Sequence, residues 1–324
     1  MARPKDPPNP PPEDPRQAQE REAARQLADQ RLLENGELPQ AAQARLAEIG
    51  QAGPGRLAFT SDLNADEAGL LRRHGYAPIC LVTGSAMYRV GQAYASTAGD
   101  CEVSELSDAY NEATRLAVER MEMEATAVHA HGVVGVRYDM VRHEWADRTV
   151  EVQLVGTAVR GPGPAPETPF LCDLSGQEWW ALWRAGYEPA ALVYGHCTWF
   201  ILTTFQDEWN EASPVNQELW HFSQALAHCR NRATQLMQRL ARGHGATGVV
   251  GVHLARRLDE VHLTGPGENP AYEREHHNLV LSMIGTAIRI RPEAPERVPA
   301  TRTVLSLRSG QLEAQDTGAE ARFV

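Results

Sequence analysis

The stretch Gly132-Val133-Val134-Gly135-Val136 decides the fold, because the chain contains it again as Gly248-Val249-Val250-Gly251-Val252. A second shared phrase follows each copy, Gly156-Thr157-Ala158-Val159-Arg160 and Gly285-Thr286-Ala287-Ile288-Arg289. Phrases that recur in the same order indicate one folding unit that is present twice. The repeat also extends toward the N-terminus, where Gly75-Tyr76-x-Pro78 recurs as Gly186-Tyr187-x-Pro189.

Each unit is predicted to have the order β-α-β-β. Mostly apolar residues predict a first strand over residues 78–90 and 189–204. Apolar residues three or four apart predict a long helix over residues 105–128, and its copy extends over 222–244. Beyond each helix apolar and polar residues alternate, beginning at Val134 in the first unit, which predicts a hairpin of two strands.

A short helix is predicted in front of each first strand. Asn64 and Ser175 are each followed three residues later by glutamate, which is the spacing of a capping box. Gly75 and Gly186 stand where a left-handed helix end favours glycine. Asn216 is the expected N-cap of the second long helix.

The predicted fold class is therefore α+β, with two units in tandem behind a disordered and a helical segment. Residues 16–55 contain few apolar side chains, so they are either a helical hairpin that docks on another surface or a solvated spacer. The expected segments are a disordered Pro-rich stretch at 1–15, the helical segment at 16–55, the first unit at 56–161, a Pro/Gly linker at 162–169, the second unit at 170–292 and a mostly flexible C-terminal tail at 293–324.

Composition excludes several classes of protein. A net charge of -11 argues against nucleic-acid binding. No run of about 18 apolar residues and no signal peptide is present, so we expect a cytoplasmic protein without membrane contact. The five cysteines do not recur between the units, which argues against a disulfide framework.

At the repeated phrases the sequence resembles the YbjQ-like family, which is labelled heavy-metal-binding. The resemblance covers residues of about 76–160 and 187–291 and includes Val-Val-Gly-Val and Gly-Thr-Ala in both units. It implies a dodecin-like β-α-β-β fold that assembles into rings, often pentamers, and a metal role. The tandem copies leave the number of chains in a ring open.

No catalytic residue and no cofactor-binding residue is predicted. Residues 243–248 match the pattern G-x-G-x-x-G of dinucleotide sites, but the helix precedes this stretch, so we interpret it as a helix end. The sequence lacks G-x-S-x-G, and residues 143–147 lack the second histidine of a zinc protease motif.

Histidines near the helix ends are the candidate metal ligands. His129 and His131 form a His-x-His pair in the first unit, and His244 lies at the matching helix end. The alternative is a histidine at a helix terminus without metal. A second polar cluster is interpreted as a solvated loop: Asp259, Glu260, His262, Glu273, Glu275, His276 and His277. No cofactor is required, and a divalent metal remains an alternative.

Three tryptophans, Trp179, Trp180 and Trp183, lie on one short predicted helix. Adjacent Trp179 and Trp180 cannot both face one core, which leaves an interface or an aromatic ligand pocket beside ordinary core packing.

Two functions remain. We favour a non-enzymatic oligomeric scaffold or ligand-binding protein of the YbjQ-like type, with a stress-related role and an unknown small ligand. Its expected partner is itself, in a ring-like homo-oligomer, because small three-stranded units leave a sheet edge uncovered. The alternative is a heavy-metal-binding or metal-dependent protein.

Overall fold

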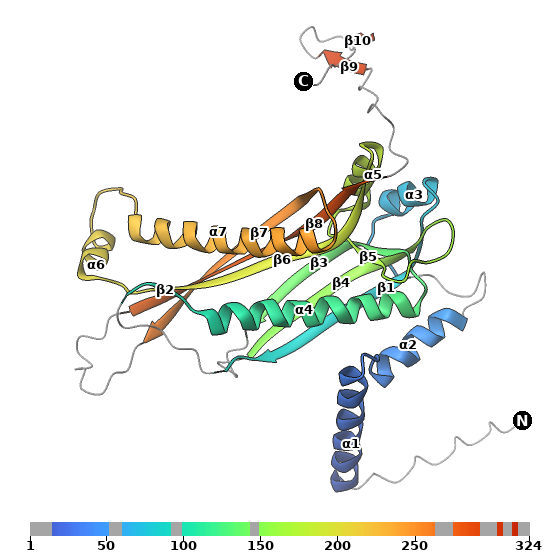
Figure 1. The fold of residues 1–324 in the computed structure, drawn as a ribbon, viewed down its shortest axis with the longest axis horizontal. Helices are drawn as coiled ribbons and strands as arrows, with labels where there is room; N and C mark the ends of the chain where they lie inside the picture. Colours follow the sequence, from blue (N-terminus) through green and yellow to red (C-terminus); the bar gives the residue numbers. More distant parts are fainter. Residues whose placement is uncertain are drawn as a thin grey trace, which may run out of the picture.

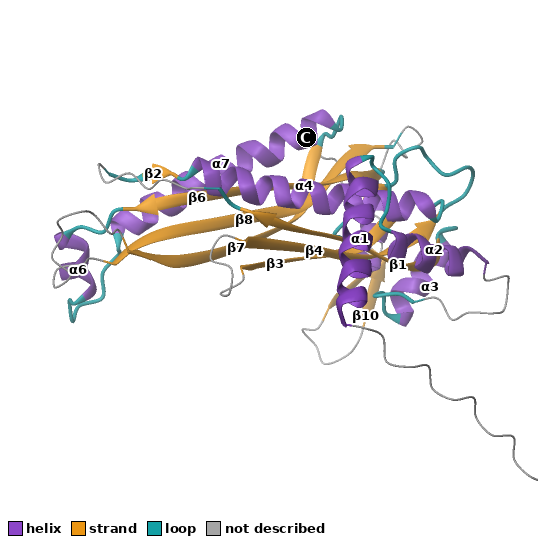
Figure 2. Ribbon diagram, turned by 90° about the horizontal axis from the view of Figure 1, so that it is seen from below, coloured by secondary structure: helices purple, strands orange, loops and turns teal. Residues whose placement is uncertain are grey.

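The computed structural model describes residues 15–51, 60–91, 99–142, 149–262, 275–291, 303–306 and 313–316. The predicted α+β class is confirmed, since two four-stranded sheets each carry a long helix on one face (Figures 1 and 2). Within these ranges, no helix combines the length and the apolar character that crossing a membrane requires.

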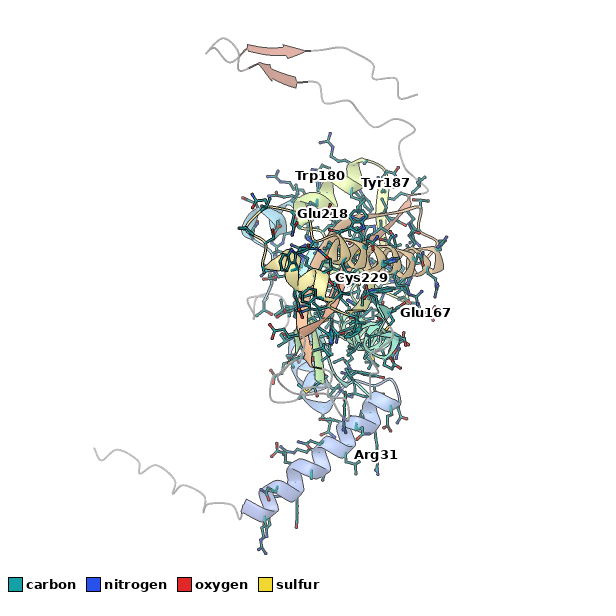
Figure 3. The ribbon with its side chains drawn as sticks, turned by 90° about the vertical axis from the view of Figure 1, so that its left-hand side faces the viewer. Arg31, Glu167, Trp180, Tyr187, Glu218 and Cys229 are labelled. Atoms are coloured by element: carbon teal, nitrogen blue, oxygen red, sulfur yellow. The ribbon has the colours of Figure 1, made fainter. Side chains whose placement is uncertain are left out.

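Two helices precede the units, α1 (Pro15–Glu34) and α2 (Gln40–Gln51). α2 docks on the first unit, where Leu46 is buried and Arg45 forms an ion pair with Glu124. α1, which carries Arg31, projects away from the body of the molecule (Figure 3). The two predicted helices are therefore confirmed, and the second one packs on the first unit.

Both units contain the same main elements. The first has α3 (Ala65–Arg73), β1 (Ala77–Arg89), β2 (Cys101–Glu102), α4 (Ser104–Ala127), β3 (Gly132–Arg142) and β4 (Thr149–Arg160). The second has β5 (Phe170–Leu171), α5 (Gly176–Arg184), β6 (Tyr187–Ile201), α6 (Phe205–Glu211), α7 (Trp220–Gly243), β7 (Gly248–His262) and β8 (Glu275–Ile290). Apart from α6 and the short strands β2 and β5, the order is the predicted β-α-β-β behind a short helix.

The outer segments differ in part from the prediction. Pro15 begins α1 and does not belong to a disordered stretch, whereas residues 1–14 lie outside the described residues. Residues 161–169 form neither helix nor strand. In the tail, β9 (Thr303–Ser306) and β10 (Glu313–Asp316) pair as an antiparallel hairpin that the sequence does not predict.

The predicted caps of the short helices are confirmed. Asn64 and Ser175 each accept a hydrogen bond from the backbone of the glutamate three residues on, and that glutamate bonds back to the cap. Gly75 and Gly186 follow these helices with φ of 80° and 84°, a conformation that disfavours residues with a Cβ.

The predicted N-cap of α7 is wrong. The helix begins at Trp220 behind Leu219, and no side chain caps it. α4 also begins without a side-chain cap, at Ser104 behind Val103. The short strand β2 leads into α4, whereas residues 212–219 before α7 form neither helix nor strand.

The two units exchange edge strands. The first sheet has the order β1-β4-β3-β5, so β5 of the second unit pairs with β3 of the first. The second sheet has the order β2-β6-β8-β7, so β2 of the first unit pairs with β6 of the second. The largest core cluster also spans both units, since Leu192 and Tyr194 of β6 pack with the core around Met121.

A bulge occurs at the same place in both hairpins. The ladder slips between Val134 and Arg137 in β3 and between Val250 and His253 in β7. Gly135 and Gly251 lie inside these bulges with φ of 63° and 66°. Each bulge leaves backbone groups that the neighbouring strand of the hairpin does not bind.

Candidate functional site

The three predicted tryptophans lie where α5 of the second unit meets the end of α3 in the first. Trp179 is buried, with its ring centroid 4.8 Å from Tyr76 and 5.3 Å from Trp183. Trp180 instead stacks on His74 at 3.6 Å. The adjacent rings therefore face different partners within the chain, as their helical spacing requires. Their role at an interface with another molecule or in an aromatic ligand pocket stays a prediction.

The three candidate metal ligands lie at the ends of the long helices. His129 is exposed just beyond α4 and has a φ of 52°. His131 is half-buried, and neither of its ring nitrogens has a hydrogen-bond partner in the described part of the chain. His244 is the exposed C-cap of α7, and Gly245 follows with a φ of 65°, so the glycine-rich stretch is a helix end as predicted.

The interpretation of the second polar cluster as a solvated loop is wrong for its described members. Residues 259–262 belong to β7 and residues 275–277 to β8, where Glu260 pairs with His277. His276 is buried, and its Nδ1 accepts a hydrogen bond from the Thr203 N–H at 3.1 Å. The described members therefore lie on the long hairpin of β7 and β8, and Glu273 lies outside the described residues.

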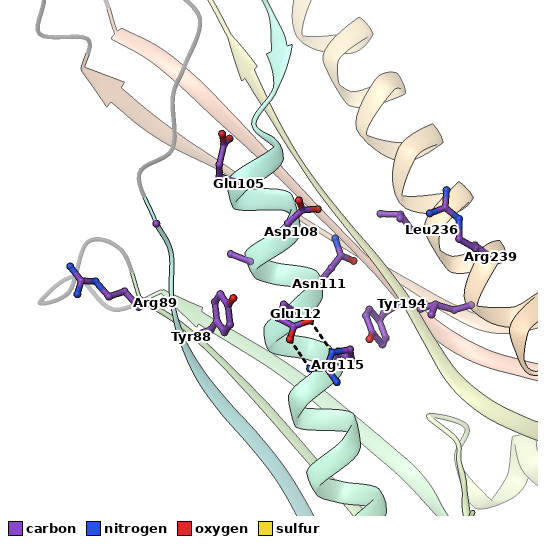
Figure 4. A pocket seen from close by; sticks show the side chains of 13 residues that line it. Tyr88, Arg89, Glu105, Asp108, Asn111, Glu112, Arg115, Tyr194, Leu236 and Arg239 are labelled. Atoms are coloured by element: carbon purple, nitrogen blue, oxygen red, sulfur yellow. Dashed lines mark hydrogen bonds and ion pairs between the residues drawn. The ribbon is translucent and has the colours of Figure 1, made fainter. Parts of the chain in front are cut away.

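A groove of about 660 Å³ lies between the first half of α4 and the second half of α7 (Figure 4). Glu112 on its α4 side accepts two hydrogen bonds from Arg115, and these bonds lower the pKa of the Glu112 carboxyl. Burial raises the pKa of Tyr194 to about 12, so this phenol stays protonated at neutral pH. The residues that line the groove include no serine, cysteine or histidine.

A second pocket, of about 510 Å³, lies between β3 and β7 and contains a buried carboxyl group. The Asp173 side chain is 4% exposed, and Thr286 donates a hydrogen bond to its Oδ1. Oδ2 of Asp173 has no hydrogen-bond partner in the described residues and lies 4.0 Å from Nε2 of His253. Burial raises the pKa of the Asp173 carboxyl. A hydrogen-bond donor in this pocket can bind Oδ2 of Asp173.

In the first unit the equivalent aspartate has an ion-pair partner. Asp62, the repeat equivalent of Asp173, forms an ion pair of 2.7 Å with Nε of Arg137. In the second unit His253 replaces this arginine at a longer distance. Asp173 could not be predicted from the sequence, because a single aspartate in front of a capping box has no distinctive pattern. Alignment of the two units would have shown that an Asp–Arg pair became an Asp–His pair.

Comparison with known proteins gives the family. A Mycobacterium tuberculosis protein named "Encapsulin nanocompartment protein Rv1762c" is 37% identical over 204 residues, which are 61% of this chain and 78% of that protein. The chain belongs to the family of this protein. A YbjQ family model described as "Putative heavy-metal-binding" matches residues 78–161. No solved structure matches the chain.

The match at residues 78–161 confirms the resemblance to the YbjQ-like family for the first unit. Protein sites for zinc use three or four ligands, and no group of three or more His, Cys, Asp or Glu in the described ranges has such an arrangement. Burial also raises the pKa of the Cys80 thiol, which disfavours the thiolate that binds metal. The described residues therefore do not fit a resident metal ion.

Proposed function

We propose that this chain is a non-enzymatic, oligomer-forming protein that associates with an encapsulin nanocompartment. The observation that carries the proposal is the identity of 37% over 204 residues to a protein named for such a compartment. The assembly is proposed to be a ring-like homo-oligomer in the cytoplasm, as the resemblance to the YbjQ-like family implies. The second unit is proposed to be a further YbjQ-like copy, because it repeats the order of elements of the matched first unit.

The geometry of the chain supports an assembly role. β2 and β5 each complete a sheet of the other unit, so the units bind each other through strand edges. α4 packs on its own β1 and also on β6 of the second unit. A unit that binds a copy of its own fold in this way can build a larger assembly from several copies.

Coexpression with an encapsulin shell protein of the source organism tests the association. We expect the chain to elute with the assembled shells in size-exclusion chromatography and to resist added protease there. The same chain expressed without the shell protein is the control for its own elution volume. Elution at that volume in the presence of assembled shells would contradict the proposal.

A further inference from the structure

The contact between the two units uses a different surface of each unit. The first unit contributes what we call the helix surface, which is the start of α4 with the residues before it and the bulged edge of β3. The second contributes the edge surface, which is the outer edge of β6 and residues 170–174. Each unit also has its own version of the surface that it does not use here. The second unit therefore keeps a helix surface on α7 and β7, and the first keeps an edge surface on β1 and residues 60–63.

The edge surface of the second unit is covered at Thr198 and His196. The Thr198 N–H donates to Oγ of Ser107 at 2.9 Å, and the Val103 N–H donates to the Thr198 carbonyl at 2.9 Å. Asn111 forms two further bonds with the backbone of His196. Thr198 and His196 are both 0% exposed as a result.

The same edge in the first unit is open around Met87. Before Met87, α4 of the same unit binds the edge, where Glu124 accepts from the Thr83 N–H and Arg120 donates to the Ser85 carbonyl. Met87 is the repeat equivalent of Thr198, and it is 57% exposed. Ser85 and Arg89 on the same edge are exposed as well. α2 covers an earlier part of this strand, where Arg45 donates to the Leu81 carbonyl. No described residue binds the outward N–H and carbonyl of Met87.

The helix surfaces show the same difference. In the first unit the N–H groups of Gly135 and Val136 donate to the carbonyls of Leu174 and Cys172 at 3.0 and 2.9 Å. The equivalent N–H groups of Gly251 and Val252 have no partner among the described residues. Val136 is 5% exposed, whereas Val252 is 44% exposed.

Equivalent residues of the two long helices also differ in burial. Ser107, Tyr110 and Thr114 of α4 are buried against the second unit. Their repeat equivalents on α7 are half-buried Ser223 and Leu226 and exposed Arg230. The positions that α4 uses to contact a neighbouring unit are therefore less buried on α7, and at Arg230 they are exposed.

Residues 60–63 already lie in the position that the contact requires. The Asp62 N–H donates to Oγ1 of Thr157 at 3.1 Å, just as the Asp173 N–H donates to Oγ1 of Thr286 at 3.0 Å. This bond fixes Ser61 and Leu63 as the repeat equivalents of Cys172 and Leu174. Their carbonyls are the groups that would accept from Val252 and Gly251 of another chain.

We propose that the helix surface of the second unit binds the edge surface of the first unit in a second copy of this chain. The contact between chains then repeats the contact within the chain, and it joins the copies head to tail. This inference rests on the oligomer of the proposed function and names its interface. It does not depend on the encapsulin shell.

Two substitutions test the interface from its two sides. Val252→Asp places a charge on the helix surface and Met87→Asp on the edge surface, and both side chains are exposed within one chain. Ile290→Asp is the matched control, because Ile290 is 59% exposed outside both surfaces. Light scattering after size-exclusion chromatography gives the mass, and far-UV circular dichroism verifies folding. Ser223→Arg and Ser85→Arg form a second pair if the first does not fold.

We expect the wild type and Ile290→Asp to have a mass of several chains, and each interface variant to have the 35.7 kDa of one chain. An equal mixture of Val252→Asp and Met87→Asp should form a dimer and nothing larger, since each retains one intact surface. A monomeric wild type, variants that keep the wild-type mass, or a mixture without dimers would overturn the proposal. A monomeric variant that still elutes with encapsulin shells would leave the proposed function intact.

Discussion

Asn111 in α4 binds both backbone groups of His196 in β6. Its Nδ2 donates to the His196 carbonyl at 2.9 Å, and its Oδ1 accepts from the His196 N–H at 3.1 Å. A neighbouring strand would form the same two bonds, so one side chain replaces a strand at this edge. The first unit thereby holds the second by more than apolar packing.

Replacement of Asn111 by alanine should destabilise the chain by about 1–3 kcal/mol, because it leaves two buried backbone groups without partners. Urea unfolding at one fixed protein concentration measures this loss. Asn216→Ala is the control, because Asn216 is exposed and caps no helix, and its effect should stay within about 0.5 kcal/mol. Equal effects of the two substitutions would contradict the role of Asn111.

A histidine at the start of α7 joins the two units. His221 contacts Asp207 of α6 through Nδ1 at 2.9 Å and Asp100 of the first unit through Nε2 at 2.7 Å. Burial lowers the pKa of His221, but the two carboxylates outweigh this effect, so the net shift raises the pKa. The ion pairs therefore stabilise the fold fully below the unfolded-state pKa of about 6.5 and lose this effect as pH rises through the folded-state pKa.

We expect the difference in unfolding free energy between the wild type and His221→Gln to be larger at about pH 5.5 than at about pH 9. Thermal unfolding across this range measures the difference. His244→Gln, an exposed histidine at the end of the same helix, should show no comparable dependence on pH. If the difference in unfolding free energy between the wild type and His221→Gln grew as pH rises, folding would lower the pKa of His221 and not raise it.

Two glycines allow the long helices to approach the first strand of each unit. A Cβ on Gly195 would overlap the Ala233 carbonyl oxygen, and one on Gly84 would overlap that of Ala117. Gly195→Ala should therefore destabilise the chain by about 1–3 kcal/mol. Gly69→Ala is the control with the opposite expected effect, because Gly69 lies inside α3 with open space around it. This substitution should stabilise the chain by about 0.4–1 kcal/mol. Calorimetry should show a lower unfolding temperature for Gly195→Ala and a higher one for Gly69→Ala than for the wild type.

Local patterns predicted the elements because their causes are local. The capping boxes of Asn64 and Ser175 depend on residues three apart, and the strand after Val134 follows from alternation. The strand exchange was not predictable in this way. β5 is a strand of two residues, too short for a period, and its partner β3 lies far back in the chain.

The same distinction applies to the sites. His129 and His131 form a local His-x-His pattern, but a metal site depends on further ligands from distant parts of the chain, which a local pattern cannot show. Asp173 has no local pattern and becomes conspicuous through burial and through its distance of 4.0 Å from His253. Equivalent positions of the two units differ in burial, and the position that is exposed in one unit but buried in the other lies on a surface that the first of these units does not use within the chain.

We expect the fold to be independent of a bound metal ion. A structural zinc site contributes about 10 kcal/mol or more and needs a complete set of ligands. His129 is exposed, and the cores of both units are formed by apolar residues on the long helices and the strands beneath them. We therefore expect a strong chelator to leave the thermal unfolding midpoint unchanged. His129→Ala combined with His131→Ala should not change the response to the chelator. A drop of many degrees that zinc reverses, and that the double substitution removes, would show that these histidines hold a structural metal ion.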